Sequence, residues 1–141
     1  MRRFLPHNFD LALLILRLAL AAVLLYHGIP KLMDFNATVA GFQGMGLPAP
    51  QVTAGLAVLA EVVGGILILL GVAVDLAGLL VILDMLGAII LVHLPNGFDF
   101  TKGGWEHPFT VLAMALALAL AGPGRFAVGK QSYKGADRRR K

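Results

Sequence analysis

Three ionisable side chains, Arg17, Glu61 and Asp84, lie inside long apolar stretches of the sequence. A lone Arg or Asp at the centre of a bilayer costs about 2.5–3.5 kcal/mol, so such groups usually pair or serve a function. Because two acids share one cation here, a brace between Arg17 and the carboxylates leaves one carboxyl either protonated or facing a further cation. Two hypotheses follow: a structural brace between helices, or a proton or ligand site centred on Glu61.

Small residues surround the glutamate in its stretch, namely Ala57, Ala60, Gly64 and Gly65. They would let a neighbouring helix, or a flat ligand, come close to Glu61. Helix packing and a quinone-sized cleft beside Glu61 are both consistent with this pattern.

A second polar set is expected at the outer ends of the apolar stretches. It consists of His27, Lys31, His93, Glu106 and His107. Such residues could handle protons, bind a quinone head group, hold metal or haem, or be solvated helix ends. Neither histidine pair has a spacing specific for metal, so we predict no metal site and disfavour haem.

Helical geometry relates the outer set to the buried charges. His27 lies ten residues past Arg17, a rotation of about 80° on an ideal helix, so both side chains can face one interior. His93 lies nine residues past Asp84, about 180° away. A straight helix therefore cannot aim both His93 and Asp84 at one centre, which argues against a single relay through all the charged groups.

The elements that position these residues are apolar helices. Of the 141 residues 58% are hydrophobic and 14% charged, whereas soluble domains have about 25% charged residues. Four stretches approach the length of about 20 residues that crosses a bilayer; they are residues 11–29, 52–71, 76–94 and 105–121. We predict an all-α integral membrane protein, a four-helix antiparallel transmembrane bundle that forms a single domain over residues 1–141.

The segments outside the four apolar stretches lead to two further predictions. Phe35, Val39 and Phe42 recur at helical spacing between the first two stretches, which indicates a short interfacial helix in the first outer loop. Arg2, Arg3 and the basic tail 125–141 hold nine of the twelve Lys and Arg residues. The positive-inside rule then places both termini in the cytoplasm of a multi-pass protein of the inner (plasma) membrane.

Composition also excludes several chemistries. The chain has no cysteine, so iron–sulfur clusters, thiolate metal sites and thiol redox centres are ruled out. The net charge of +4 is concentrated in the tail and has no accompanying aromatic platform, so we predict no nucleic-acid partner. Arg17 interrupts the first apolar run, which argues against a cleaved secretory signal.

Several motifs, in order, resemble the DoxX family. They are Arg17, Tyr26-His27-Gly28-x-x-Lys31, Gly46-Leu47-Pro48, Glu61-x-x-Gly64-Gly65, His93-x-Pro95-Asn96-Gly97-Phe98, Gly103-Gly104-Trp105-Glu106-x-Pro108 and Gly122-Pro123-Gly124-Arg125-Phe126. The resemblance runs from about residue 11 to residue 128 and implies a small four-span bundle. It departs from the family pattern at Asp84 and at residues 126–129.

The resemblance leaves the activity open. Some relatives are subunits of thiosulfate:quinone oxidoreductase, others join membrane complexes for thiol and oxidative-stress defence, and distant ones resemble assembly chaperones or cargo receptors. By matching position it implies a cofactor site made of Arg17, His27, Lys31, Glu61, His93 and Glu106. Asp84 is expected to be a local brace.

The leading hypothesis is a membrane subunit of an oxidoreductase that passes electrons to ubiquinone or menaquinone. Glu61, His27 and Arg17 are its expected catalytic residues, with Glu61 handling protons. Without cysteine the chain needs a partner protein, or a bound cofactor, to bring electrons; membrane lipid and a partner or homo-oligomer are its expected contacts. The alternatives are a non-catalytic membrane scaffold or assembly factor and, in an oligomer, a conduit for small solutes.

Overall fold

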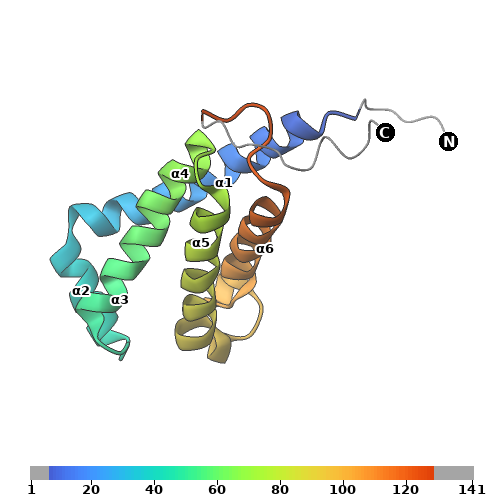
Figure 1. Cartoon of the computed structure of the whole chain (residues 1–141). Coiled ribbons are helices and arrows are strands. Elements are labelled where there is room, and N and C mark those ends of the chain that lie inside the picture. The colour runs from blue at the N-terminus through green and yellow to red at the C-terminus, as the bar shows by residue number, and fades with distance from the viewer. Residues whose placement is uncertain (1–6, 129–141) are drawn as a thin grey trace.

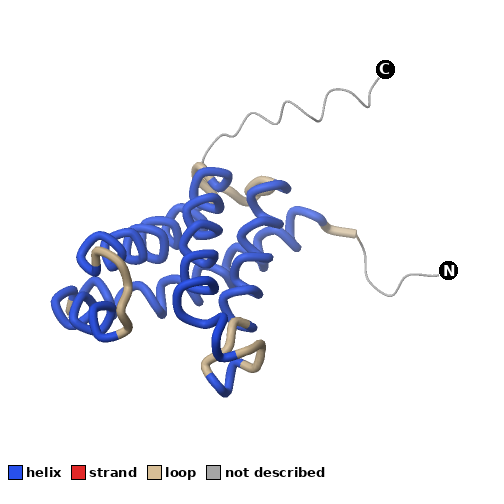
Figure 2. The backbone as a smooth tube through the Cα atoms, turned by 90° about the horizontal axis from the view of Figure 1, so that it is seen from below, coloured by secondary structure: helices blue, strands red, loops and turns tan. Residues whose placement is uncertain are grey.

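A computed structural model describes residues 7–128, which are helical, with no strand in that range (Figure 1 and Figure 2). The α-helices are α1 (Phe9–Met33), α2 (Phe35–Gly44), α3 (Pro50–Val58), α4 (Gly64–Leu70), α5 (Val74–Ala88) and α6 (Glu106–Ala121). Two π-helical segments, η1 (Leu59–Val63) and η2 (Ile89–His93), and two 3₁₀ turns, η3 (Leu94–Asn96) and η4 (Phe100–Lys102), complete the elements. The prediction of an all-α chain is confirmed.

In the described range, three helical runs are long and apolar enough to cross a membrane: Phe9–Met33, Pro50–Leu70 and Val74–Asn96. The second run joins α3, η1 and α4, and the third joins α5, η2 and η3. Helix α6 is apolar but has only 16 residues, about 24 Å at 1.5 Å per residue. It meets the predicted position of the fourth span, while its crossing of the bilayer stays a prediction.

Helix α1 extends beyond its predicted end at residue 29. Pro30 lies inside the helix, and its carbonyl accepts the Asp34 N–H at 3.1 Å, so the last turn continues to Met33. Asp34 then caps α2, because its Oδ1 accepts the Ala37 N–H at 3.0 Å. The expected helix in the first loop therefore exists as α2, directly joined to α1, and Lys31 belongs to the last turn of α1.

The helices pack tightly at one end. Figure 1 shows the α3–α4 run, α5 and α6 side by side, with α1 crossing behind them. The core that joins them includes Leu20, Leu24, Ile68, Val81 and Leu118. A Cβ at Gly78 of α5 would come within 2.9 Å of the Ala119 Cβ of α6, so the glycine permits this close helix contact.

Candidate functional site

Arg17 is 1% exposed, and its guanidinium binds only backbone carbonyls in the described part of the chain. Nε donates to the Ile68 carbonyl at 2.9 Å and Nη2 to that of Leu69 at 2.6 Å. Nη1 donates to the carbonyls of Pro123 and Phe126, both at 3.0 Å. The cation thus satisfies carbonyls at the C-terminal end of α4, where a helix has no intrahelical donors left.

This arrangement corrects the prediction that Arg17 braces the two buried acids. It ties α1 to the end of α4 and to the segment 122–128, and within residues 7–128 it makes no ion pair. Gly71 has φ 74°, and a Cβ there would meet the Arg17 guanidinium carbon at 2.8 Å. We call this group of contacts the Arg17 end of the molecule.

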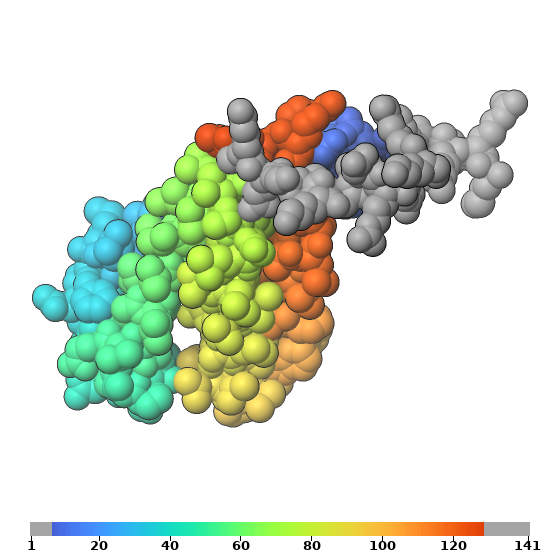
Figure 3. All heavy atoms as spheres, in the orientation of Figure 1, coloured from blue at the N-terminus to red at the C-terminus, as the bar shows by residue number. Residues whose placement is uncertain are grey.

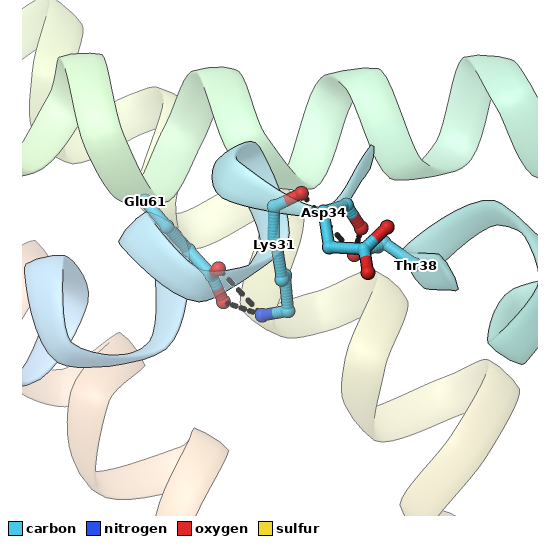
Figure 4. A network of polar contacts seen from close by, with 4 residues as sticks. All are labelled: Lys31, Asp34, Thr38 and Glu61. Atoms are coloured by element: carbon cyan, nitrogen blue, oxygen red, sulfur yellow. Dashed lines mark hydrogen bonds and ion pairs between the residues drawn. The ribbon is translucent and has the colours of Figure 1, made fainter. Parts of the chain in front are cut away.

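Glu61 pairs instead with Lys31. The Lys31 Nζ lies 2.6 Å from Oε1 and 2.5 Å from Oε2, so one ammonium holds both carboxylate oxygens (Figure 4). The glutamate side chain is 7% exposed and that of the lysine 26%. Figure 4 also shows Thr38 near Lys31; its hydroxyl donates to the Lys31 carbonyl at 3.2 Å. Lys31 is therefore the cationic partner of Glu61, the role that the sequence analysis expected Arg17 to have.

A glycine of α1 sets the distance between the two helices that carry this pair. A Cβ at Gly28 would lie 2.7 Å from the Glu61 Cβ and 3.1 Å from its backbone carbon. Glu61 stands in the middle of the π-helical segment η1. Such segments insert an extra residue into a helical turn and often occur at functional sites.

A cavity of about 830 Å³ opens beside the pair, with mostly apolar walls. Figure 3 shows its opening between α3, in teal, and the yellow segment that follows α5. The titratable residues that line it are His27, Lys31, Glu61, Asp84, His93 and His107. We call it the Glu61 cavity. It has the size and composition typical of small-molecule sites, which occupy about 300–1,000 Å³.

The small residues around Glu61 divide into two groups. Ala57 and Ala60 line the Glu61 cavity. By contrast, a Cβ at Gly64 would meet Val81 at 3.3 Å, and one at Gly65 would meet Leu25 at 3.2 Å. The alanines thus leave room for a ligand, whereas the glycines serve helix packing.

Asp84 lines the same cavity as Glu61. Its Oδ2 is buried without a hydrogen bond, the only side-chain atom of its kind in residues 7–128. Glu61 and Lys31 lie near enough to interact electrostatically with the Asp84 carboxyl. Both hydrogen bonds of the Lys31 ammonium, however, go to Glu61. The expected local brace at Asp84 is therefore wrong: its Oδ2 makes no hydrogen bond to any residue in the range 7–128.

His93 lines the same cavity as Asp84, although an ideal α-helix would place the two side chains on opposite faces. The π-helical segment η2 explains the difference. A π-turn rotates each residue about 18° less than an α-turn, so five π-residues bring His93 to about 90° from Asp84 instead of about 180°. The His93 Nδ1 lies 2.7 Å from the Gly103 carbonyl oxygen. A carbonyl only accepts, so Nδ1 carries a proton in this contact.

The other two histidines meet at the mouth of the cavity. The ring centroids of His27 and His107 are 5.2 Å apart, and the charges of Lys31 and Glu61 act on His27. Helix α1 supplies His27 and the first turn of α6 supplies His107. Sequence reasoning placed His107 in the outer set but not among the site residues; its position two residues after Trp105, at a helix start, was the available signal.

Glu106 lies outside the cavity lining and organises the loop before α6. Its Oε2 accepts the Phe100 N–H at 3.2 Å, and its own N–H donates to the Phe98 carbonyl at 3.0 Å. In this loop the Thr101 hydroxyl and N–H hold the pKa of Asp99 below its usual range. Gly104 is buried against this loop backbone, which positions Gly103 for His93.

Comparison with known proteins decides the family. The sequence model of DoxX matches residues 12–94, more than half of the chain. The chain belongs to the DoxX family. That match includes Lys31, Glu61, Asp84 and His93, and ends before His107.

Three relatives in this comparison cover most of the DoxX chain. "Putative oxidoreductase CatD" of Bacillus subtilis is 30% identical over 91% of this chain and 92% of that protein. "Uncharacterized membrane protein Rv3486" of Mycobacterium tuberculosis is 35% identical over 86% and 81%, respectively. "Inner membrane protein YphA" of Escherichia coli is 31% identical over 84% and 89%. No solved structure matches the chain.

The structure thus brings together four of the six site residues predicted for this DoxX protein. His27, Lys31, Glu61 and His93 line one cavity, while Arg17 and Glu106 serve the two ends of the bundle. No group of three or more His, Asp or Glu residues in the described range could hold a metal ion. The sequence analysis singled out Asp84 but not as a site residue; the pattern that could have placed it in the cavity is its spacing on α5, where Leu80, Asp84 and Ala88 share one helix face.

Proposed function

We propose that this DoxX protein binds a quinone in the Glu61 cavity as the membrane subunit of an oxidoreductase. The observation that carries the proposal is the cavity itself: an apolar space of about 830 Å³ with one polar cluster on its wall. Quinones combine a flat ring, polar oxygens and an apolar tail, and such a ligand needs this combination of surfaces. The printed name of the Bacillus relative, an oxidoreductase, agrees with the proposal.

The residues fit the roles that a quinone site requires. When bound, a quinone supplies a centre that takes up two electrons and two protons. Lys31 uses two hydrogen-bond directions for Glu61 and keeps a third N–H for a ligand oxygen. Glu61, His27 and His107 form a series of groups that can hold or pass protons between the cavity and its mouth.

Electrons have to come from outside the described residues. The chain contains no cysteine, so no thiolate or iron–sulfur centre can deliver them. We propose that a partner protein provides them at the outer end of the helices, where His107 and the 97–105 loop lie. A protein partner also agrees with α2, which has no buried residue.

The proposed topology is a four-span bundle with both termini on the cytoplasmic side. Its support is the meeting of the two chain ends at the Arg17 end, where the Arg125 N–H donates to Asp10 Oδ1 at 2.8 Å. Helix α6 would then return to the side on which α1 begins. Of the nine basic residues that set this orientation, Arg125 is described, while Arg2, Arg3 and the six in the range 129–141 lie outside the described residues. The name of the Escherichia relative agrees with the inner membrane.

Equilibrium binding of ubiquinone and menaquinone analogues to the purified protein in detergent tests the function. We expect saturable binding that weakens at least about ten-fold in Glu61→Gln, since the variant frees Lys31 and removes a proton-handling group. Asp75→Asn is the matched control, because Asp75 is an exposed acid at the opposite end of α5. Absence of saturable binding in the wild type refutes the proposal and favours the non-catalytic scaffold.

A further inference from the structure

We infer that the ligand of the Glu61 cavity carries a long apolar tail, which leaves the cavity sideways into the bilayer over Gly87. The inference rests on the proposed function and adds two things to it, the class of ligand and a residue that selects the tail. Its basis is the position and composition of the opening between the second and third helical runs.

This opening, visible in Figure 3, is edged by side chains that face lipid. Leu56 and Leu59 belong to the second run, and Leu83 and Leu91 belong to the third. All four line the cavity and are between 42% and 59% exposed. Because both runs are long and apolar enough to cross a membrane, their exposed leucines face hydrocarbon. The opening therefore leads into the bilayer.

The opening also lies at the depth of the acyl chains. Leu56 follows Pro50, the start of the second run, by six residues, and Gly87 precedes Asn96, the end of the third run, by nine. At 1.5 Å per residue, these positions are about 9 Å and about 14 Å from the helix ends. The hydrocarbon core is about 30 Å thick. An opening at this depth suits an apolar chain that is already dissolved in the membrane.

Gly87 forms a notch in the α5 edge of the opening. It stands four residues from both Leu83 and Leu91, a spacing that puts the three residues on one helix face. Gly87 lines the cavity, and a Cβ there would meet no other part of the described chain within 4 Å. A glycine inside a helix costs about 0.5–1 kcal/mol relative to alanine. Helix packing explains this cost at Gly64 and Gly65, whereas at Gly87 the structure offers only space for a ligand.

The other mouth of the cavity has the opposite character. His27 and His107 meet there, and both are exposed. An apolar tail at this mouth would lose about 25 cal/mol for each Å² left in water. A ring bound at Lys31 therefore has a polar exit for protons at the histidines and an apolar exit for its tail at Gly87.

A helix of a second protein chain is another occupant that exposed leucines could attract. Such a helix is about 10 Å across with its side chains, so it would cover the edges of the opening and leave the apolar space behind them unfilled. Unfilled space forfeits dispersion contacts of its lining. A tail that continues from a ring inside the cavity fills the cavity and the opening together, and this continuity favours the tail.

Photolabelling of the full chain in lipid nanodiscs locates the tail. The probe is a ubiquinone analogue with a diazirine in its tail. We expect adducts in the segments 56–59 and 83–91 that disappear with excess decylubiquinone. Adducts at His27 and His107 instead, or adducts that the competitor does not reduce, would overturn the inference. This experiment uses the wild type, so it does not depend on how variants fold.

Equilibrium binding of decylubiquinone and of the ubiquinone ring without a tail tests Gly87. The indole of Gly87→Trp would occupy the opening, so we expect it to weaken binding of decylubiquinone at least about ten-fold and that of the bare ring by less than about two-fold. Gly55→Trp in α3 is the matched control, because a Cβ there also meets no other part of the described chain within 4 Å and the residue does not line the cavity. Gly87→Ala should bind both as the wild type does, with an equal or higher Tm.

The outcomes separate the inference from the proposed function. Equal losses for both ligands in Gly87→Trp, no loss for decylubiquinone, or the same loss in Gly55→Trp would overturn the inference and leave the proposed function standing. A wild type that binds neither ligand refutes the proposed function, and the inference with it.

Discussion

The Arg17 end and the Glu61 cavity both hold a basic residue of α1, and they treat it in opposite ways. Arg17 is enclosed by carbonyls of the backbone, and each hydrogen bond it makes joins two segments of the fold. Lys31 neutralises one acid, Glu61, while the Oδ2 of another, Asp84, makes no hydrogen bond to the described residues around the cavity. A buried charge with all its partners in the backbone serves stability, whereas a buried polar atom without a hydrogen bond beside a cavity indicates a ligand.

The two regions also differ in the regularity of their helices. The tight end of the bundle has regular α-helices and the close Gly78–Ala119 contact. Both π-helical segments occur at the cavity, one carrying Glu61 and the other His93. Irregular turns thus appear where polar side chains have to face a common space, as expected for functional sites.

The largest effect should come from Arg17→Leu. Loss of the guanidinium removes the Arg17 donors from the carbonyls of Leu69, Pro123 and Phe126 and leaves that of Ile68 with the Gly71 N–H alone. We therefore expect the free energy of unfolding to fall by about 3–5 kcal/mol. Thermal and denaturant unfolding in detergent measure it. Arg17→Lys is the control: it keeps the charge but cannot span four carbonyls, so its loss should be intermediate. An Arg17→Leu variant as stable as the wild type would contradict the structural role of the Arg17 end.

Gly28→Ala should have the next largest effect. The new Cβ would press on the Glu61 backbone and force α1 away from η1, for which we expect a loss of about 1–3 kcal/mol together with weaker ligand binding. Gly41→Ala in α2 is the matched control, because nothing lies within 4 Å of its Cβ position. Equal stability of the two variants would show that α1 and η1 are less tightly packed than the structure has them.

The smallest expected effect is a coupling energy, which should be present between Lys31 and its acid but absent between Arg17 and Asp84. A double-mutant cycle of Lys31→Met and Glu61→Gln should give a coupling energy of about 1 kcal/mol or more, because the side chains are in direct contact. The same cycle for Arg17→Leu and Asp84→Asn should be additive within about 0.5 kcal/mol. Coupling in the second cycle, and none in the first, would contradict the Lys31–Glu61 pair and support the ion pair between Arg17 and a buried acid that the sequence suggested.

The sequence already indicated which residues were unusual. Charged groups in apolar stretches are expensive, so Arg17, Glu61 and Asp84 stood out without a structure. It could not assign their partners, because depth along a span leaves the rotation of each helix open. Arg17 could as well have reached an acid as the carbonyls of Ile68 and Leu69.

The composition and periodicity of the chain determined its helices, its membrane character and the small helix after α1, since these depend on local hydrophobicity and spacing. Only the tertiary structure decided that Lys31 pairs with Glu61, that Arg17 binds the backbone, and that His93 and Asp84 line one cavity. The physical reason is that a π-turn and a glycine contact alter rotation and distance by amounts that no residue count along an ideal helix can supply.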